Sequence, residues 1–186
     1  MAEHKLQETV ALLSRTPATL DALLRGQPDI WTRRNEGESS WSAFDVVGHL
    51  IEGERTDWIP RARMILESGE SETFKPFDRF AHARQNQGKV VQEKSMDGLL
   101  EEFNRLRTQN LVELSSMRLQ PDQLNRCGRH PSFGTVTLGQ LLATWAMHDM
   151  THLHQLTRIM AFQYRETVGP WSKFLGVMHC NGHSAD

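Results

Sequence analysis

The sequence predicts an all-α protein: a four-helix bundle with long interhelical connections and a short C-terminal helix. Four stretches repeat apolar residues at intervals of three or four, which places them on one face of a helix. The segments between these stretches differ in length and contain proline and glycine. A chain of 186 residues is long enough for one domain with its own core. We therefore expect a single domain over residues 1–186, with 179–186 as a flexible tail.

The first helix is predicted over residues 3–25. Pro17 interrupts its apolar pattern and is expected to kink the helix, and Gly26 is expected to end it. The polar segment 27–40 follows as a loop. Its one aromatic residue, Trp31, either packs down as a lid over the core or lines the mouth of a pocket.

The second helix is predicted over residues 43–68. Ser42 is the expected N-cap, with Asp45 in the first turn. Pro60 should bend this helix rather than end it, because the apolar pattern continues beyond the proline. Residues 69–94 then form a long connection, which its phenylalanines are expected to anchor over the bundle. They are Phe74, Phe77 and Phe80.

The third helix is predicted over residues 96–117, where Asn110 interrupts the apolar stripe. This residue is either a hydrogen-bonded core amide or a polar group that faces a site. Residues 118–136 are expected to form a loop. Residues 171–178, just after Pro170, are expected to form the short terminal helix.

The longest helix is predicted over Thr137–Gln163, with Thr137 and Gln140 as a capping box. His148 and His152 lie one turn apart inside its apolar stripe, whereas His154 points to the opposite face. A buried imidazole needs a partner for each ring nitrogen, and two on one turn can share a metal ion. A metal site and a satisfied core pair both remain open.

Two further observations limit the weight of that motif. The chain has nine histidines, so a pair four residues apart can arise by chance. His179 and His183 form such a pair in a tail where Gly182 argues against a helix.

On a helical wheel, His49 lies well away from the centre of its apolar face, which predicts a surface or edge histidine.

Composition narrows the classes of partner and compartment. A formal charge of −2 gives no basic footprint for nucleic acid. No apolar run is long enough for a membrane span, and the N-terminus lacks the apolar region of a signal peptide. Cys127 and Cys180 do not form a CxxC motif and are expected to be free thiols in a reducing cytoplasm.

Three segments together resemble the DinB-like family: WSAFDVVGHLIEGERTDWIPR, HDMTHLHQLTRIMAFQY and VGPW. The wider superfamily includes thiol-dependent S-transferases and mycothiol-dependent maleylpyruvate isomerases. The resemblance covers residues 5–178 and implies a four-helix bundle that holds a divalent metal with three histidines. Carried over position by position, the ligands are His49, His148 and His152. For His49 the resemblance overrules the helical wheel.

Three imidazoles with an open coordination position are typical of catalytic zinc sites. Nickel and iron(II) accept the same nitrogen ligands, so the metal remains undetermined. The open position can hold water or the thiolate of a low-molecular-weight thiol. Asp149 is either an acid that orients an imidazole or a helix-surface acid, and Asn110 is a second candidate near the site. Glu52, three residues after His49, is expected to stay solvated.

These features predict a divalent-metal-dependent transferase or hydrolase acting on a small molecule, with a low-molecular-weight thiol as candidate cosubstrate. The alternative is a non-catalytic metal- or ligand-binding stress-response protein on the same scaffold. HDMTH is a poor match to the HExxH motif of zinc proteases, since aspartate is shorter than glutamate. A di-iron bundle needs two E-x-x-H pairs, and here only Asp149-x-x-His152 comes close. The apolar residues of the terminal segment either cover a second copy in a homodimer or close the bundle's own end. They are Trp171, Phe174 and Leu175.

Overall fold

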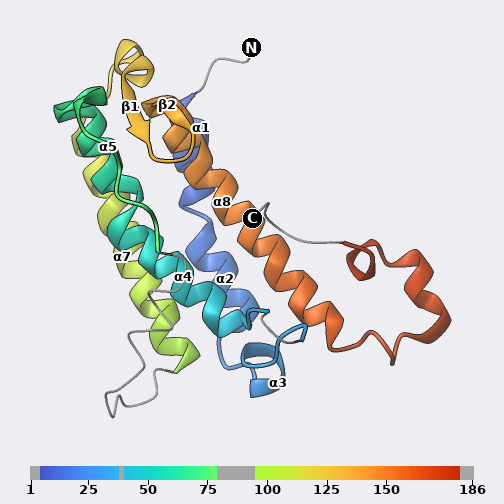
Figure 1. Ribbon diagram of the computed structural model, residues 1–186. Coiled ribbons are helices and arrows are strands. Elements are labelled where there is room, and N and C mark those ends of the chain that lie inside the picture. Colours follow the sequence, from blue (N-terminus) through green and yellow to red (C-terminus); the bar gives the residue numbers. More distant parts are fainter. Residues whose placement is uncertain (1–4, 38–39, 79–94, 181–186) are drawn as a thin grey trace.

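The computed structural model describes residues 5–37, 40–78 and 95–180. It is a four-helix bundle with a small two-stranded sheet, which confirms the predicted fold class (Figure 1). Predictions for Phe80, for His183 and for the last six residues lie outside the described ranges. The helices that occupy the four positions of the bundle are, in chain order, α1 (Leu6–Leu13) with α2 (Thr16–Leu24), α4 (Ala43–Thr56) with α5 (Trp58–Glu67), α7 (Met96–Ser116), and α8 (Leu138–Phe162).

Short elements connect and extend these helices. They are α3 (Asp29–Thr32), η1 (Gly69–Ser71), η2 (Pro121–Asn125), β1 (Cys127–His130), β2 (Gly134–Thr137), η3 (Gly169–Phe174) and η4 (Gly176–Met178). No helix in the described ranges is both long enough and apolar enough to cross a membrane. Cys127 and Cys180 are free thiols, as predicted.

The first two positions of the bundle each consist of two helices rather than one kinked helix. Pro17 lies in the first turn of α2, where a backbone N–H has no partner within the helix and proline is tolerated. The interruption between α1 and α2 therefore lies just before this proline. Pro60 likewise lies in the first turn of α5. Asp57 separates α4 from α5 with φ −109° and ψ −68°. The bend predicted at Pro60 is therefore a break at Asp57.

The segment predicted as a loop before the histidine helix contains a β-hairpin. β1 and β2 are antiparallel, with Cys127 opposite Thr137. The hairpin lies close against α5 at Gly128, where an added Cβ would be 2.6 Å from Ile65 Cγ1 and 2.9 Å from Phe74 Cζ. Phe74 is buried and donates its backbone N–H to the carbonyl of Arg129 at 2.9 Å. This phenylalanine anchors the connection as predicted.

The hydrophobic core has two clusters. One lies among α2, α4, α7 and the C-terminal half of α8, and the other among α1, α5, the second half of α7 and the N-terminal half of α8. Four buried polar residues, one from each position of the bundle, are joined by hydrogen bonds, and we call these four the buried ionic layer. They are Thr16, Glu54, Arg107 and Asp149.

Arg107 is the centre of the buried ionic layer. Its Nη1 and Nη2 donate to the two carboxylate oxygens of Asp149 at 2.6 and 2.9 Å, and Nη2 also donates to Glu54 at 2.8 Å. The Thr16 hydroxyl donates to Asp149, and the Trp145 indole N–H donates to Glu54. Burial lowers the pKa of Arg107, but the two carboxylates outweigh it and raise that pKa overall. The layer is thus charged and hydrogen-bonded.

Beyond the end of α8 the C-terminal segment turns back (Figure 1), and η4 contacts α8. The single short helix predicted here is instead two 3₁₀ turns, η3 and η4. Trp171 and Phe174 are 71 % and 72 % exposed, so they do not close the end of their own bundle.

Candidate metal centre

The structure brings the three sequence-selected histidines together. His49 comes from α4, and His148 and His152 come from successive turns of α8. The Nε2 atom of His148 lies 3.0 Å from Nε2 of His49 and 3.1 Å from Nε2 of His152. His49 and His152 are each only 4 % exposed. The surface or edge position that the helical wheel gave His49 is therefore wrong.

The spacing of the three nitrogens suits a metal ion. Zinc–imidazole bonds are about 2.0–2.1 Å long, which puts two ligand nitrogens of a tetrahedral ion about 3.3 Å apart. The Nε2 separations of 3.0 and 3.1 Å come close to that value. Imidazole nitrogen is also a donor type that divalent transition metals prefer. These residues fit the group that the family resemblance implies.

Gln155 gives His152 the tautomer that a metal ligand needs. Its side-chain Oε1 lies 2.7 Å from His152 Nδ1, and Gln155 is only 2 % exposed. An amide oxygen can only accept, so Nδ1 carries the ring proton and the lone pair is on Nε2. Sequence reasoning missed this residue. The available signal was a glutamine three residues after His152, at a position of α8 that packs inward.

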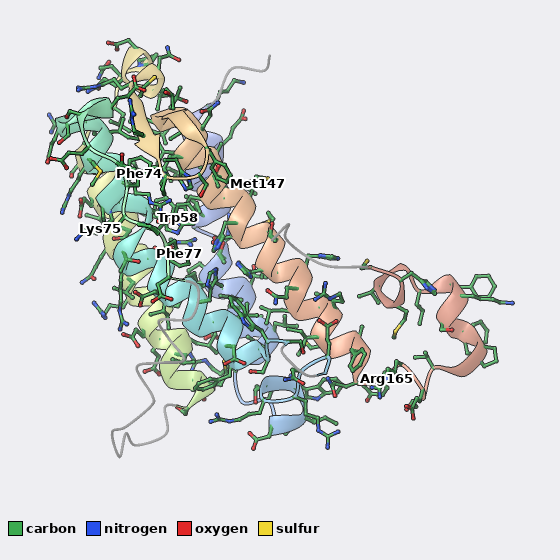
Figure 2. The ribbon with its side chains drawn as sticks, viewed as in Figure 1. Trp58, Phe74, Lys75, Phe77, Met147 and Arg165 are labelled. Atoms are coloured by element: carbon green, nitrogen blue, oxygen red, sulfur yellow. The ribbon has the colours of Figure 1, made fainter. Side chains whose placement is uncertain are left out.

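Aromatic rings surround the histidines. Trp41 lies 4.8 Å from the His49 ring and stacks at 6.2 Å on the His152 ring, measured between centroids. Phe77 meets His49 edge-on at 5.2 Å, and Trp58 meets His148 edge-on at 5.1 Å. Figure 2 shows Trp58 and Phe77 between the α4–α5 pair and α8. These contacts restrict the rotation of the imidazole rings and cover them from solvent.

The three histidines line a cavity of about 610 Å³. This volume is in the range of sites that bind small molecules. Most of its wall is apolar or aromatic, with contributions from α4, α5, α8, the hairpin and the 74–77 segment. The large apolar side chains of the wall are Trp41, Trp58, Phe74, Phe77, Phe133 and Leu141.

Two ion pairs also line this cavity. Arg158 donates to both carboxylate oxygens of Glu36 at 2.8 and 2.5 Å. Arg61 Nε lies 2.6 Å from Asp57 Oδ1. Burial raises the pKa of Asp57 to about 6, outweighing the opposite effect of Arg61. Burial also lowers the pKa of Arg61, and burial together with the Arg61 charge lowers the pKa of nearby His130.

The other residues selected from the sequence are Asp149, Asn110 and Glu52. Asp149 is 1 % exposed and bound by Arg107, so it is not a helix-surface acid. Asn110 Nδ2 donates to the backbone and the carboxylate of Glu54, as a core amide does. Contact of either residue with an imidazole stays a prediction. Glu52 is only 9 % exposed, so the prediction that it stays solvated is wrong.

Fold and site together define a helical-bundle protein with a three-histidine candidate metal centre on the wall of a cavity. The chain belongs to the DinB superfamily, whose family model matches residues 12–156. This match confirms the resemblance drawn from the sequence motifs.

A solved structure shares the fold. Its description is: "YfiT from Bacillus subtilis is a probable metal-dependent hydrolase with an unusual four-helix bundle topology". The TM-score is 0.69 at 20 % sequence identity, and the alignment covers 90 % of each chain. A comparison with curated protein sequences found no match.

Proposed function

We propose that this protein is a divalent-metal-dependent hydrolase of a small molecule, with His49, His148 and His152 as the metal ligands. The observation that carries the proposal is the convergence of three Nε2 atoms on the wall of a 610 Å³ cavity, with that of His148 3.0 Å from His49 and 3.1 Å from His152. The description of YfiT as a "probable metal-dependent hydrolase" supports the same reaction class.

A metal ion bound here would polarise the substrate and activate water for attack. The chain's own residues prepare the site for that chemistry. Gln155 holds His152 with its Nε2 lone pair available, and the rings of Trp41 and Phe77 pack against the imidazoles. The apolar wall would hold the body of a small substrate beside the histidines. Zinc, nickel and iron(II) all suit three imidazoles.

The ligand set favours catalysis over simple metal storage. Within the described ranges, the cluster of metal-ligating side chains contains these three histidines and no cysteine, aspartate or glutamate. Three protein ligands leave a coordination position for water, substrate or a low-molecular-weight thiol. A fourth protein ligand would instead favour a non-catalytic binding protein.

Metal analysis and a substrate screen test the proposal. Purified protein is analysed for zinc, nickel and iron, stripped, reloaded with each ion, and assayed on uncharged esters and amides with and without added thiols. Metal-dependent hydrolysis in the absence of thiol, lost in His148→Ala, is the expected result. Turnover that requires thiol would make the protein a transferase, and bound metal without turnover would make it a binding protein. Failure to bind any of the three ions would overturn the metal site itself.

A further inference from the structure

Asp57 occupies the break between α4 and α5 and faces the same cavity as the histidines. His49, Gly53 and Asp57 are spaced four residues apart, so they lie on successive turns of one side of the chain. All three line the cavity. The carboxylate is thus placed in the cavity wall by the same helix that supplies a candidate metal ligand.

Trp58, the residue after Asp57, packs against the candidate metal centre. Its indole meets the His148 ring at 5.1 Å, and its Nε1 lies 3.2 Å from the place where a Gly53 Cβ would be. The residue that follows Asp57 is therefore packed between α4 and the histidine helix. This packing fixes the backbone at the helix break and with it the position of the carboxylate.

One oxygen of the Asp57 carboxylate is held and the other is available. Arg61 Nε binds Oδ1 at 2.6 Å, whereas Oδ2 has no hydrogen bond within the part of the chain that the structure describes. Arg61 is itself fixed, because its Nη2 donates to the Lys75 carbonyl at 3.2 Å and its guanidinium lies 5.2 Å above the Phe74 ring. The side chain of Asp57 is 10 % exposed.

We propose that Asp57 is the general base and acid of this cavity. The assignment rests on the proposed hydrolase function and adds a catalytic residue to it. A water molecule in the cavity adds its oxygen to the carbonyl carbon of an ester or amide while its proton moves to Asp57 Oδ2. As the bond to the leaving group breaks, Asp57 returns that proton to the leaving oxygen or nitrogen. One water is consumed, an acid and an alcohol or amine are released, and Asp57 is again a carboxylate.

The proton affinity of Asp57 suits this task. An ordinary aspartate, with a pKa of about 3.9, is a weak base at neutral pH. Burial raises the pKa of Asp57 to about 6, close to the pH at which both protonation states are useful. Arg61 on α5 is its ion-pair partner. The other charged or titratable groups that line the same cavity are Glu36, His49, His130, His148, His152 and Arg158. Of these, Arg61 opposes the rise, and burial prevails.

The decisive experiment compares Asp57→Asn with Asp21→Asn in the metal-loaded protein, on an ester or amide that the wild type hydrolyses. Asp21 is a matched control, because it forms the same i,i+4 ion pair with Arg25 but on the surface. We expect Asp57→Asn to lower kcat by about 10²- to 10⁴-fold and to move the acid limb of the pH profile from near pH 6 to the lower pH at which protons displace the metal. Asp21→Asn should change neither quantity.

Chemical rescue separates proton transfer from a structural role. Asp57→Ala should regain part of its activity with added formate or azide, whose small anions can occupy the vacated space. Metal content is measured in every variant. Wild-type turnover that persists in Asp57→Asn with its acid limb intact, or a slow Asp57→Ala that no anion rescues, overturns the role of Asp57 alone. A wild type without metal-dependent turnover overturns the hydrolase proposal.

Discussion

Each imidazole of the candidate metal centre depends on different neighbours for its orientation. His152 is held by the Gln155 amide, His148 lies against Trp58, and His49 lies between Trp41 and Phe77. Two of the histidines share α8, and the third comes from α4. The site therefore depends on the packing of two helices as well as on the three ligands.

Replacing any one of the three histidines by alanine should sharply reduce the metal content, because two imidazoles are a poor site for a divalent ion. Elemental analysis of the purified variants measures this. His154→Ala is the control, since His154 is exposed on the outer side of α8. Full metal retention in His49→Ala would contradict the three-histidine site.

Replacing Gln155 by leucine should weaken metal binding by about 10- to 100-fold without removing a ligand, because His152 would lose the partner that fixes its tautomer. Competition with a chromogenic chelator measures the dissociation constant. Gln109→Leu, at an exposed position of α7, provides the matched control. Equal affinity in the two variants would show that the Gln155 contact has no influence on the metal.

At the level of the helices, the buried ionic layer is the feature most sensitive to change. Arg107 binds carboxylates from two other helices while almost completely buried. Arg107→Met would leave Glu54 and Asp149 buried without their cation, so we expect a loss of about 3–5 kcal/mol in the free energy of unfolding. Urea denaturation measures the loss. Arg105→Met, two residues away and exposed, should stay within about 0.5 kcal/mol of the wild type.

The helix starts could be predicted because their signals are local. Ser42 is the N-cap that the sequence indicates, and Thr137 with Gln140 forms the predicted capping box. The hairpin could not be predicted in this way. Its strands are only four residues long, and they depend on the fit of Gly128 against Ile65 and Phe74, which are distant in the sequence.

The helical wheel failed for His49 because it assumes that a helix buries only one face. All residues of α4 from Val46 to Glu54 are buried, so this helix has no solvent-facing side at the level of the histidine. Family resemblance supplied the residue that periodicity could not. Gln155 and Asp57 escaped notice for a related reason, since their partners become apparent only when helices are packed.

For the whole molecule, removing the metal should lower the melting temperature at neutral pH, because an ion that binds the folded chain and not the unfolded chain stabilises the fold. The loss should be moderate, since both apolar clusters remain packed. Near pH 5 the chelator effect should disappear, because free histidine titrates near pH 6.5 and protons then compete for the ligands. Melting curves with and without chelator at the two pH values test this. No chelator effect at either pH, with metal absent throughout, would indicate ordinary core histidines.

Assembly is testable through the C-terminal segment. Trp171 and Phe174 are largely exposed in the single chain, and we propose that a second copy covers them in a homodimer. Sedimentation at micromolar concentration should show a species of twice the 21.3 kDa chain mass. The double variant Trp171→Ser/Phe174→Ser should sediment as the monomer. A wild type that is monomeric under these conditions would contradict the dimer.

The buried ionic layer also restricts how the helices slide past one another. Shifting α7 by one turn, about 5.4 Å, would move Arg107 away from Glu54 and Asp149 and break two buried ion pairs. Glu54 lies five residues after His49, and Asp149 directly follows His148. The same ion pairs therefore keep the histidines of α4 and α8 at matching positions along the bundle axis. Insertions in the connections between helices should therefore leave the metal centre intact, whereas a single residue inserted within α7 should misalign it.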